Sequence, residues 1–149
     1  PITNTKKEST VDLIGRLSEK GVVCNVTAIF TIEQVEKVIS KINPNTPIIL
    51  SVFAGRIADA GIDPIDMMKK SVSLSKQKSK SEILWASTRE IINIFQAEEA
   101  GCHIITVPHE LLNKFSTIGK SLENYSLETV SAFYNDAKAA GYSIKKSNK

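Results

Sequence analysis

The chain has 149 residues, of which 42% are hydrophobic and 23% are charged. This composition excludes a disordered chain, and the length allows a single domain, residues 1–149, whose core needs no metal or disulfide staple. The net charge is +3, from 19 basic and 16 acidic residues, which is weak support for nucleic-acid binding, and no apolar run approaches the ~20 residues of a membrane helix.

Strand-like and helical patterns alternate along the chain. Four apolar runs predict strands of a parallel sheet that is covered on both faces. In chain order these runs are residues 21–30, 47–53, 82–86 and 102–107. Helical periodicity predicts helices over residues 11–17 and on to Gly21, 32–42, 91–95, 110–115 and about 126–140. The order is therefore that of repeated strand–helix units.

Two pairs of residues have the spacing of a capping box, which marks the start of a helix. Thr31 and Gln34 precede the second helix, and Ser87 and Glu90 precede the third. The serine- and lysine-rich stretch over residues 71–81 reads as the end of a further helix followed by a solvated loop.

Repeated parallel strand–helix units leave two architectures, an open doubly wound sheet or a (β/α)8 TIM barrel. No glycine-rich GxGxxG or Walker-type loop follows a strand, which lowers the weight of a nucleotide-binding open sheet. A barrel of eight units takes about 250 residues. The four strands predicted here therefore supply about half of a barrel.

The remaining composition bears on partners and compartment. Cys24 and Cys102 are too few for a disulfide scaffold, and no secretory leader is visible, so we expect reduced, buried thiols in a cytoplasmic protein. Excess positive charge lies in a loop and in the tail, at Lys76, Lys78, Lys80, Lys145, Lys146 and Lys149. Such lysines are more often solvated surface than a nucleic-acid site, so we expect neither a nucleic-acid nor a membrane partner.

Active sites of parallel α/β folds lie at the carboxyl ends of the strands. Arg56 and Arg89 follow successive predicted strands, each a few residues after a serine, Ser51 or Ser87. Guanidinium groups bind phosphate oxygens bidentately, and a helix start at Ser87 would add free amide groups, so these residues make a candidate phosphate clamp. The alternative is that Ser87 only caps a helix and that Arg89 is a surface residue.

Other polar residues near the strand ends are less specific. Asn25 and Thr27 lie two apart in an apolar strand, either as buried groups satisfied by the backbone or as ligands for a carbonyl, hydroxyl or catalytic water. His103 and His109 lack cysteine or carboxylate partners at metal-ligand spacing, which favours a structural role. The sequence therefore predicts no metal site.

Several short motifs in register resemble the transaldolase family, whose shorter members are of the fructose-6-phosphate aldolase type. In chain order they are PIT (1–3), CNVTAIFT (24–31), SVFAGRIAD (51–59), ILWASTRE (83–90) and AGCHIITVP (100–108). The resemblance covers nearly the whole chain. It implies a (β/α)8 barrel that needs no cofactor, in which a lysine Schiff base transfers a dihydroxyacetone unit between phosphorylated sugars of the pentose phosphate pathway.

The resemblance also implies a role for each matching residue. Thr27 matches the threonine that holds the catalytic water, and Asn25 matches the asparagine that contacts the dihydroxyacetone unit. Ser51 lies on the substrate side, and phenylalanine at Phe53 leans towards transaldolase rather than aldolase behaviour. Phosphate binding falls to the remaining matches, Arg56, Ser87 and Arg89. Thr88 departs from the aromatic residue usual after this serine.

The resemblance places the Schiff-base lysine two residues before the PIT motif, upstream of Pro1. Lys6 and Lys7 do not match that position. We therefore expect the carboxyl-terminal half of a transaldolase barrel, inactive until joined to a companion amino-terminal half that carries the lysine, and a homo-oligomer, as in the family. The alternatives are a genuine short form, a fructose-6-phosphate aldolase-type lyase, or a non-catalytic module that binds sugar phosphates or assists assembly.

Overall fold

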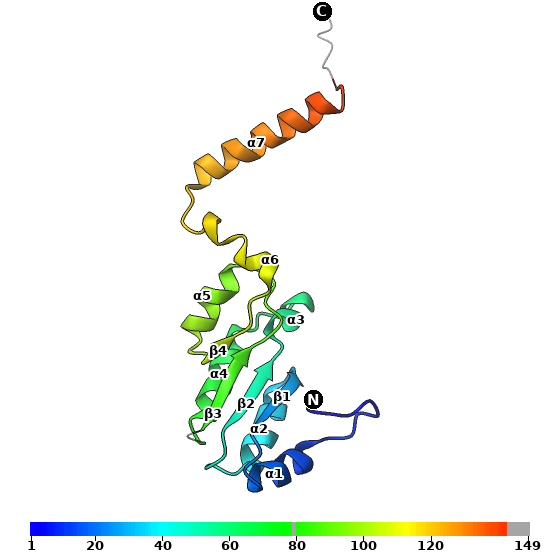
Figure 1. The fold of residues 1–149 in the computed structure, drawn as a ribbon, viewed down its shortest axis with the longest axis vertical. Coiled ribbons are helices and arrows are strands. Elements are labelled where there is room, and N and C mark those ends of the chain that lie inside the picture. The colour runs from blue at the N-terminus through cyan, green and yellow to red at the C-terminus, as the bar shows by residue number, and fades with distance from the viewer. Residues whose placement is uncertain (79, 143–149) are drawn as a thin grey trace, which may run out of the picture. The chain divides into compact units, whose positions relative to one another are not determined.

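The computed structural model describes residues 1–78 and 80–142 and divides the chain into two compact units, Pro1–Lys114 and Phe115–Lys149. The first unit holds a four-stranded parallel sheet of order β1-β2-β3-β4 (Figure 1). Its strands are β1 (Cys24–Ile29), β2 (Ile48–Val52), β3 (Ser81–Trp85) and β4 (Ile104–Ile105). The predicted α/β class and all four predicted strands are confirmed, whereas a single domain and a half barrel stay predictions.

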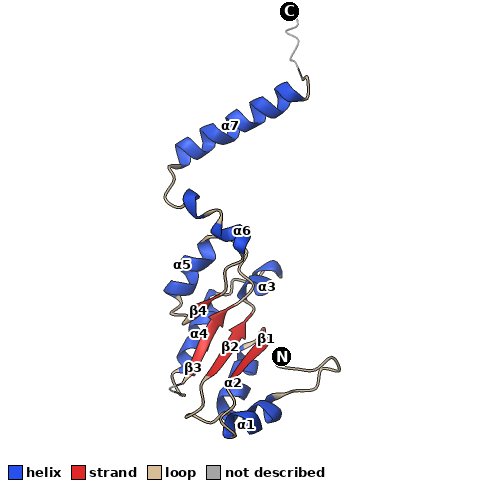
Figure 2. Ribbon diagram, in the orientation of Figure 1, coloured by secondary structure: helices blue, strands red, loops and turns tan. Residues whose placement is uncertain are grey.

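The helices of the first unit include two that were not predicted as separate elements. They are α1 (Val11–Glu19), α2 (Ile32–Lys41), α3 (Ala54–Asp59), α4 (Ile65–Ser75), α5 (Ile92–Glu99) and α6 (His109–Leu112). α3 begins directly after β2, and only the end of α4 was expected from the sequence. Helices α1, α2, α4 and α5 are neighbours in that order, and Figure 2 shows the sheet lying against them.

The hydrophobic core lies between the sheet and these helices. Alternate residues of a strand point to opposite faces, so Val26, Leu50 and Ile83, which are in register, all face the helices and are at most 2% exposed. The opposite face carries Asn25 and Glu82, both exposed. The expected covering of both faces is therefore wrong for this unit, because helices pack on one face only.

One predicted capping box forms and the other does not. The Thr31 hydroxyl accepts a hydrogen bond from the Gln34 amide (3.3 Å), and the Gln34 side chain accepts one from the Thr31 amide (3.1 Å). The box at Ser87 is wrong, because α5 begins only at Ile92. The Asn93 side chain accepts instead from the amides of residues 89 and 90, at 3.0 Å each, and so satisfies them before the helix starts.

Strand β4 is shorter than residues 102–107 because a histidine side chain takes part in its pairing. The His103 amide donates to the Ile83 carbonyl, and His103 Nδ1 accepts from the Ile83 amide, both at 3.0 Å. The imidazole thus replaces a backbone carbonyl at this end of the strand. This contact supports the structural role expected for His103.

The second unit contains a 3-10 turn (Phe115–Thr117) and the helix α7 (Leu122–Ala139). The predicted terminal helix is confirmed, and it starts four residues earlier than expected, where the Ser121 side chain accepts from the Asn124 amide. No residue of α7 is buried. Lys145, Lys146 and Lys149 lie outside the described residues. Among the described helices, none is long and apolar enough to cross a membrane.

Candidate active site

The carboxyl ends of the strands meet at one edge of the sheet, where α3 and α6 also lie (Figure 2). Asn25 and Ser51 come from neighbouring strands near this edge. The Ser51 hydroxyl, which is buried, donates to Asn25 Oδ1 at 2.7 Å. Because the oxygen of the Asn25 amide is occupied, its exposed NH2 group is the part that can bind a ligand. The structure thus brings together two of the residues that the sequence singled out.

Thr27 lies where strand β1 becomes irregular. The register of β1 against β2 shifts between Val26 and Ile29, and Ala28 has a φ of 58°. Such bulges turn a side chain out of the regular alternation of a strand. Thr27 is half-buried, and its hydroxyl makes no hydrogen bond to another residue in the described part of the chain. This hydroxyl is therefore available to a ligand or a water molecule.

Phe53 and Arg56 belong to the start of α3. The Phe53 ring lies 5.6 Å from the Phe30 ring, and the Arg56 guanidinium carbon lies 5.5 Å from the centre of the Phe53 ring. A cation over an aromatic face is held without a neutralising carboxylate. Arg56 forms no ion pair within residues 1–78 and 80–142, so its full positive charge is presented at the strand ends.

The first turn of α3 lies directly against the turn that follows β3. The Gly55 amide donates to the Ala86 carbonyl at 3.3 Å. A Cβ at Gly55 would lie 1.5 Å from the Ser87 carbonyl oxygen and 3.1 Å from Cγ of Arg89. Only glycine permits this approach, which places Arg56 on one side of the contact and Ser87 with Arg89 on the other. Sequence reasoning missed Gly55, although it directly precedes Arg56.

Arg89 reaches back across this contact to helix α3. Its Nη2 and Nε atoms donate to Asp59 Oδ2 at 2.8 and 3.1 Å. Both side chains are about half exposed, at 49% and 53%. Asp59 was also missed, because its partner is 30 residues away and no local spacing connects them. Arg89 is therefore an oriented residue and not a free surface arginine.

A cavity of about 340 Å³ opens beside Arg89. Six residues from the ends of β3 and β4 line it: Ser87, Thr88, Arg89, Thr106, Val107 and Pro108. Ser87 has a φ of 65°, in the left-handed region, and a non-glycine residue held there is often found at a functional site. Thr88 is 5% exposed, and its hydroxyl has no hydrogen-bond partner among the described residues. The cavity combines a positive charge with hydroxyl groups, which suits an anionic oxygen ligand.

The residues described contain no group of three or more histidine, cysteine, aspartate or glutamate side chains that could hold a metal ion. Burial raises the pKa of the half-buried Cys102 thiol to about 11. Cys102 is therefore protonated at neutral pH and a poor nucleophile. The chemistry available to this edge of the sheet is anion binding and hydrogen bonding. The roles expected for Asn25, Thr27 and the arginines stay predictions.

Comparison with known proteins adds an independent finding. A family model described as transaldolase/fructose-6-phosphate aldolase matches residues 1–148. The probable transaldolase 2 of Listeria monocytogenes is 36% identical over 109 residues, which cover 72% of this chain and 48% of the relative. The probable transaldolase of Caldicellulosiruptor saccharolyticus is 33% identical over 102 residues, covering 67% and 45%. The chain thus spans about half the length of the relatives it matches.

Proposed function

Since this chain belongs to the transaldolase/fructose-6-phosphate aldolase family, we propose that it supplies the substrate-phosphate and water-binding part of a transaldolase. The reaction is transfer of a dihydroxyacetone unit between phosphorylated sugars. The observation that carries this proposal is the contact of Gly55 with Ser87, which gathers Arg56, Ser87 and Arg89 at the carboxyl ends of β2 and β3. The protein acts in the cytoplasm.

The two arginines bind the phosphate of the sugar. Two positive charges, one stacked on Phe53 and one oriented by Asp59, match the charge of a phosphate monoester. Binding the phosphate end fixes the position of the ketone at the other end of the substrate. Because this anchoring lies away from the bond that breaks, its binding energy can be used to orient the reacting carbons.

Asn25 and Thr27 serve the reacting end. A lysine amine from outside this chain attacks the ketone, water leaves, and the protonated imine takes up the electron pair of the adjacent carbon–carbon bond as it breaks. The Asn25 NH2 group holds a hydroxyl of the dihydroxyacetone unit, and Thr27 holds the water that transfers protons. The unpartnered Thr27 hydroxyl and the occupied Oδ1 of Asn25 support these two roles.

The lysine comes from a companion amino-terminal half of the barrel. The Ile2 amide donates to the Thr27 carbonyl at 2.9 Å, so the chain from Pro1 runs along the open edge of β1. A strand upstream of Pro1 would continue along that edge. In the register of parallel strands, the residue two before Pro1 would lie beside Asn25 and share its face of the sheet. An amine there would reach the substrate that Asn25 holds.

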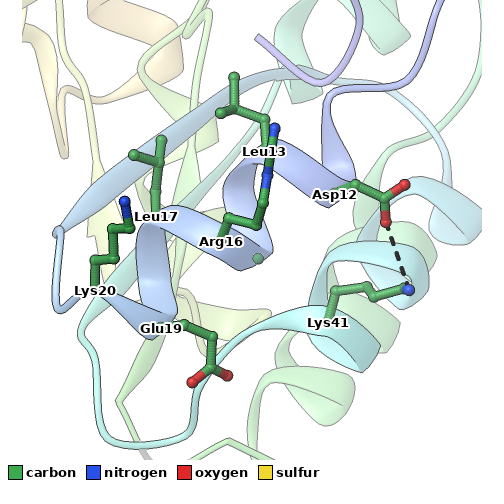
Figure 3. Close-up of a pocket in the computed structure, with 8 residues that line it drawn as sticks. Asp12, Leu13, Arg16, Leu17, Glu19, Lys20 and Lys41 are labelled. Atoms are coloured by element: carbon green, nitrogen blue, oxygen red, sulfur yellow. Dashed lines mark ion pairs between the residues drawn. The ribbon is translucent and has the colours of Figure 1, made fainter.

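The companion half packs on helix α1, next to this open edge. A groove of about 680 Å³ runs along α1 and is lined by Leu13, Leu17 and charged residues that include Arg16 and Lys41 (Figure 3). Leu13 is 47% exposed, and Val22 and Val23, before β1, are 43% and 61% exposed. Apolar side chains beside an unpaired strand edge are typical of a surface that another element covers.

Exposed apolar residues of α7 support association with further copies of the protein as a homo-oligomer. Leu122, Leu127, Val130, Phe133 and Tyr134 are each 59% exposed or more. Size-exclusion chromatography with light scattering tests this part of the proposal. A monomer at micromolar concentration would contradict it.

The binding test uses this chain directly. Fructose 6-phosphate should bind measurably more tightly than fructose in calorimetry, and inorganic phosphate should compete. Arg56→Ala should weaken fructose 6-phosphate about 10- to 100-fold, because a charge-assisted contact is lost, while fructose is unaffected. Lys114 lies outside the cluster, so Lys114→Ala is a control for loss of one positive charge. Equal affinity for fructose and fructose 6-phosphate would remove the clamp.

The catalytic test joins this chain to the lysine-bearing half of a family member. Thr27→Ala should lower kcat about 100-fold or more, with a smaller change in KM, because proton transfer loses its positioned water. Thr27→Ser should keep most of the turnover. Full turnover in Thr27→Ala would show that Thr27 is only structural. Release of free dihydroxyacetone without transfer to an aldose acceptor would indicate the alternative aldolase-type lyase.

A further inference from the structure

Asp59 is the carboxylate that determines how Arg89 points. It lies on α3, three residues after Arg56, so the two side chains are on the same side of that helix. Arg89 comes from the turn before α5, 30 residues away. The ion pair between them is therefore a tertiary contact that crosses from one part of the candidate phosphate site to the other.

The geometry of this contact leaves part of the guanidinium free. Both hydrogen bonds from Arg89, through Nε and Nη2, go to the same oxygen, Oδ2 of Asp59. A guanidinium has five N–H donors, so three donors on Nη1 and Nη2 stay available. These three form the end-on fork that binds phosphate oxygens bidentately. Asp59 thus holds the side of the guanidinium and leaves its end open to a ligand.

The local packing gives Arg89 few other ways to be held. A Cβ placed on Gly55 would come within 3.1 Å of Arg89 Cγ, so the stem of Arg89 runs against the start of α3. Arg89 is also a lining residue of the 340 Å³ cavity. With the stem against α3 and one edge of the guanidinium on Asp59, the open end lies at the cavity.

The ion pair itself adds little to stability. Both side chains are about half exposed, and pairs of this kind are screened by water. Its effect is instead on the free site, where the negative charge of Asp59 offsets part of the repulsion between Arg56 and Arg89. An arginine that is oriented before the ligand arrives loses less conformational freedom on binding.

We propose that Asp59 is a positioning residue for phosphate recognition: it holds the Nε edge of Arg89 so that the other end of the guanidinium faces the phosphate of the substrate. This inference rests on the proposed function. It predicts that removal of a negative charge from the site weakens the binding of an anion. Simple electrostatics predicts the opposite, so the sign of the effect separates positioning from mere charge neutralisation.

The experiment follows the arginine Nε–Hε signals of the intact chain by NMR during titration with inorganic phosphate. In the wild-type protein, the signals of Arg56 and Arg89 should shift together and saturate. Asp59→Ala should broaden the Arg89 signal and raise the Kd for phosphate about three- to tenfold. Asp59→Glu should restore most of the affinity. Asp59→Asn, which keeps the shape and one acceptor oxygen, should fall between them.

Glu90→Gln is the matched control, because it removes the same charge from the residue next to Arg89 without touching an ion pair. It should leave the Kd unchanged or lower it slightly. Phosphate that binds Asp59→Ala as tightly as, or more tightly than, the wild-type chain would overturn the positioning role while leaving the clamp intact. No saturable shift of either arginine in the wild-type chain would overturn the clamp, and the positioning role with it. Amide signals of residues 54–59 report whether α3 is still folded in each variant.

Discussion

The two faces of the sheet differ in their side chains and in how they are covered. On the helix side, Val26, Leu50 and Ile83 form an apolar row that is at most 2% exposed. On the other side, the row formed by Asn25, Ile49 and Glu82 is polar at both ends and only Ile49 is half-buried. Because burial of apolar area is the main source of stability, the helix side holds the unit together and the other side is free to carry chemistry.

The largest difference between the faces should appear on truncation of adjacent residues of β2. Leu50 is fully buried, so Leu50→Ala should lower the free energy of unfolding by about 2–5 kcal/mol. Ile49→Ala, on the other face, should lower it by about 1 kcal/mol, in proportion to its partial burial. Urea unfolding monitored by Trp85 fluorescence measures both. Equal losses would contradict the assignment of the core to the helix side.

A smaller loss of stability, with a larger effect on the site, is expected at Gly55. Gly55→Ala places a Cβ 1.5 Å from the Ser87 carbonyl oxygen, so the backbone must shift, which costs about 1–3 kcal/mol. The shift should also separate Arg89 from Asp59 and change the Arg89 Nε–Hε signal.

Ala58→Gly, on the exposed side of the same helix, is the control for Gly55→Ala. It should cost at most about 1 kcal/mol, through helix propensity alone, and leave the Arg89 signal in place. Identical spectra of Gly55→Ala and the wild-type protein would show that α3 and the turn after β3 are not in close contact.

The two predicted capping boxes supply a third comparison. Thr31→Ala removes a hydroxyl that accepts from the Gln34 amide, and it should lower the free energy of unfolding by about 1 kcal/mol. Ser87→Ala removes no cap, so its effect on stability should stay within about 0.5 kcal/mol. It should instead weaken phosphate binding. A larger stability loss in Ser87→Ala than in Thr31→Ala would reverse this assignment.

The smallest effect concerns Cys102, whose pKa is raised by burial from 9.0 to about 11. Below pH 9, the thiol is protonated in both the folded and the unfolded chain and adds no pH dependence. As the pH rises from 9 towards 11, the unfolded chain loses its proton first, so stability falls. Alkylation of Cys102 by iodoacetamide at pH 8 should be about 10- to 100-fold slower than that of a free thiol. Labelling at the free-thiol rate would show that Cys102 is not buried.

Local patterns in the sequence were enough to predict some elements and not others. The strands and the Thr31 capping box could be predicted because their signals lie within a few adjacent residues. Ser87 had the same spacing as Thr31, yet the cap failed because the Asn93 side chain satisfies the same amides. A one-sided pattern cannot show which of two competing acceptors wins.

The candidate site could be predicted only in part for a related reason. The polar residues at the strand ends follow from the rule that parallel strands end at one edge, and the family motifs add their expected roles. Gly55 and Asp59 act through tertiary contacts with residues about 30 positions away, Ser87 and Arg89. Without the fold, the sequence offers no reason to connect them. His103, which replaces a carbonyl in the pairing of β4, was missed as a contact for the same reason.

The central claim is that this chain binds the phosphorylated substrate while the amine that attacks it comes from elsewhere. Borohydride reduction in the presence of fructose 6-phosphate tests it directly, because it converts a Schiff base into a stable amine that mass spectrometry can locate. Incubated alone, this chain should stay unlabelled. Mixed with the lysine-bearing half of a family member, it should promote labelling of that half, and Arg56→Ala should reduce the labelling. A reduced sugar adduct on a lysine of this chain alone would contradict the account.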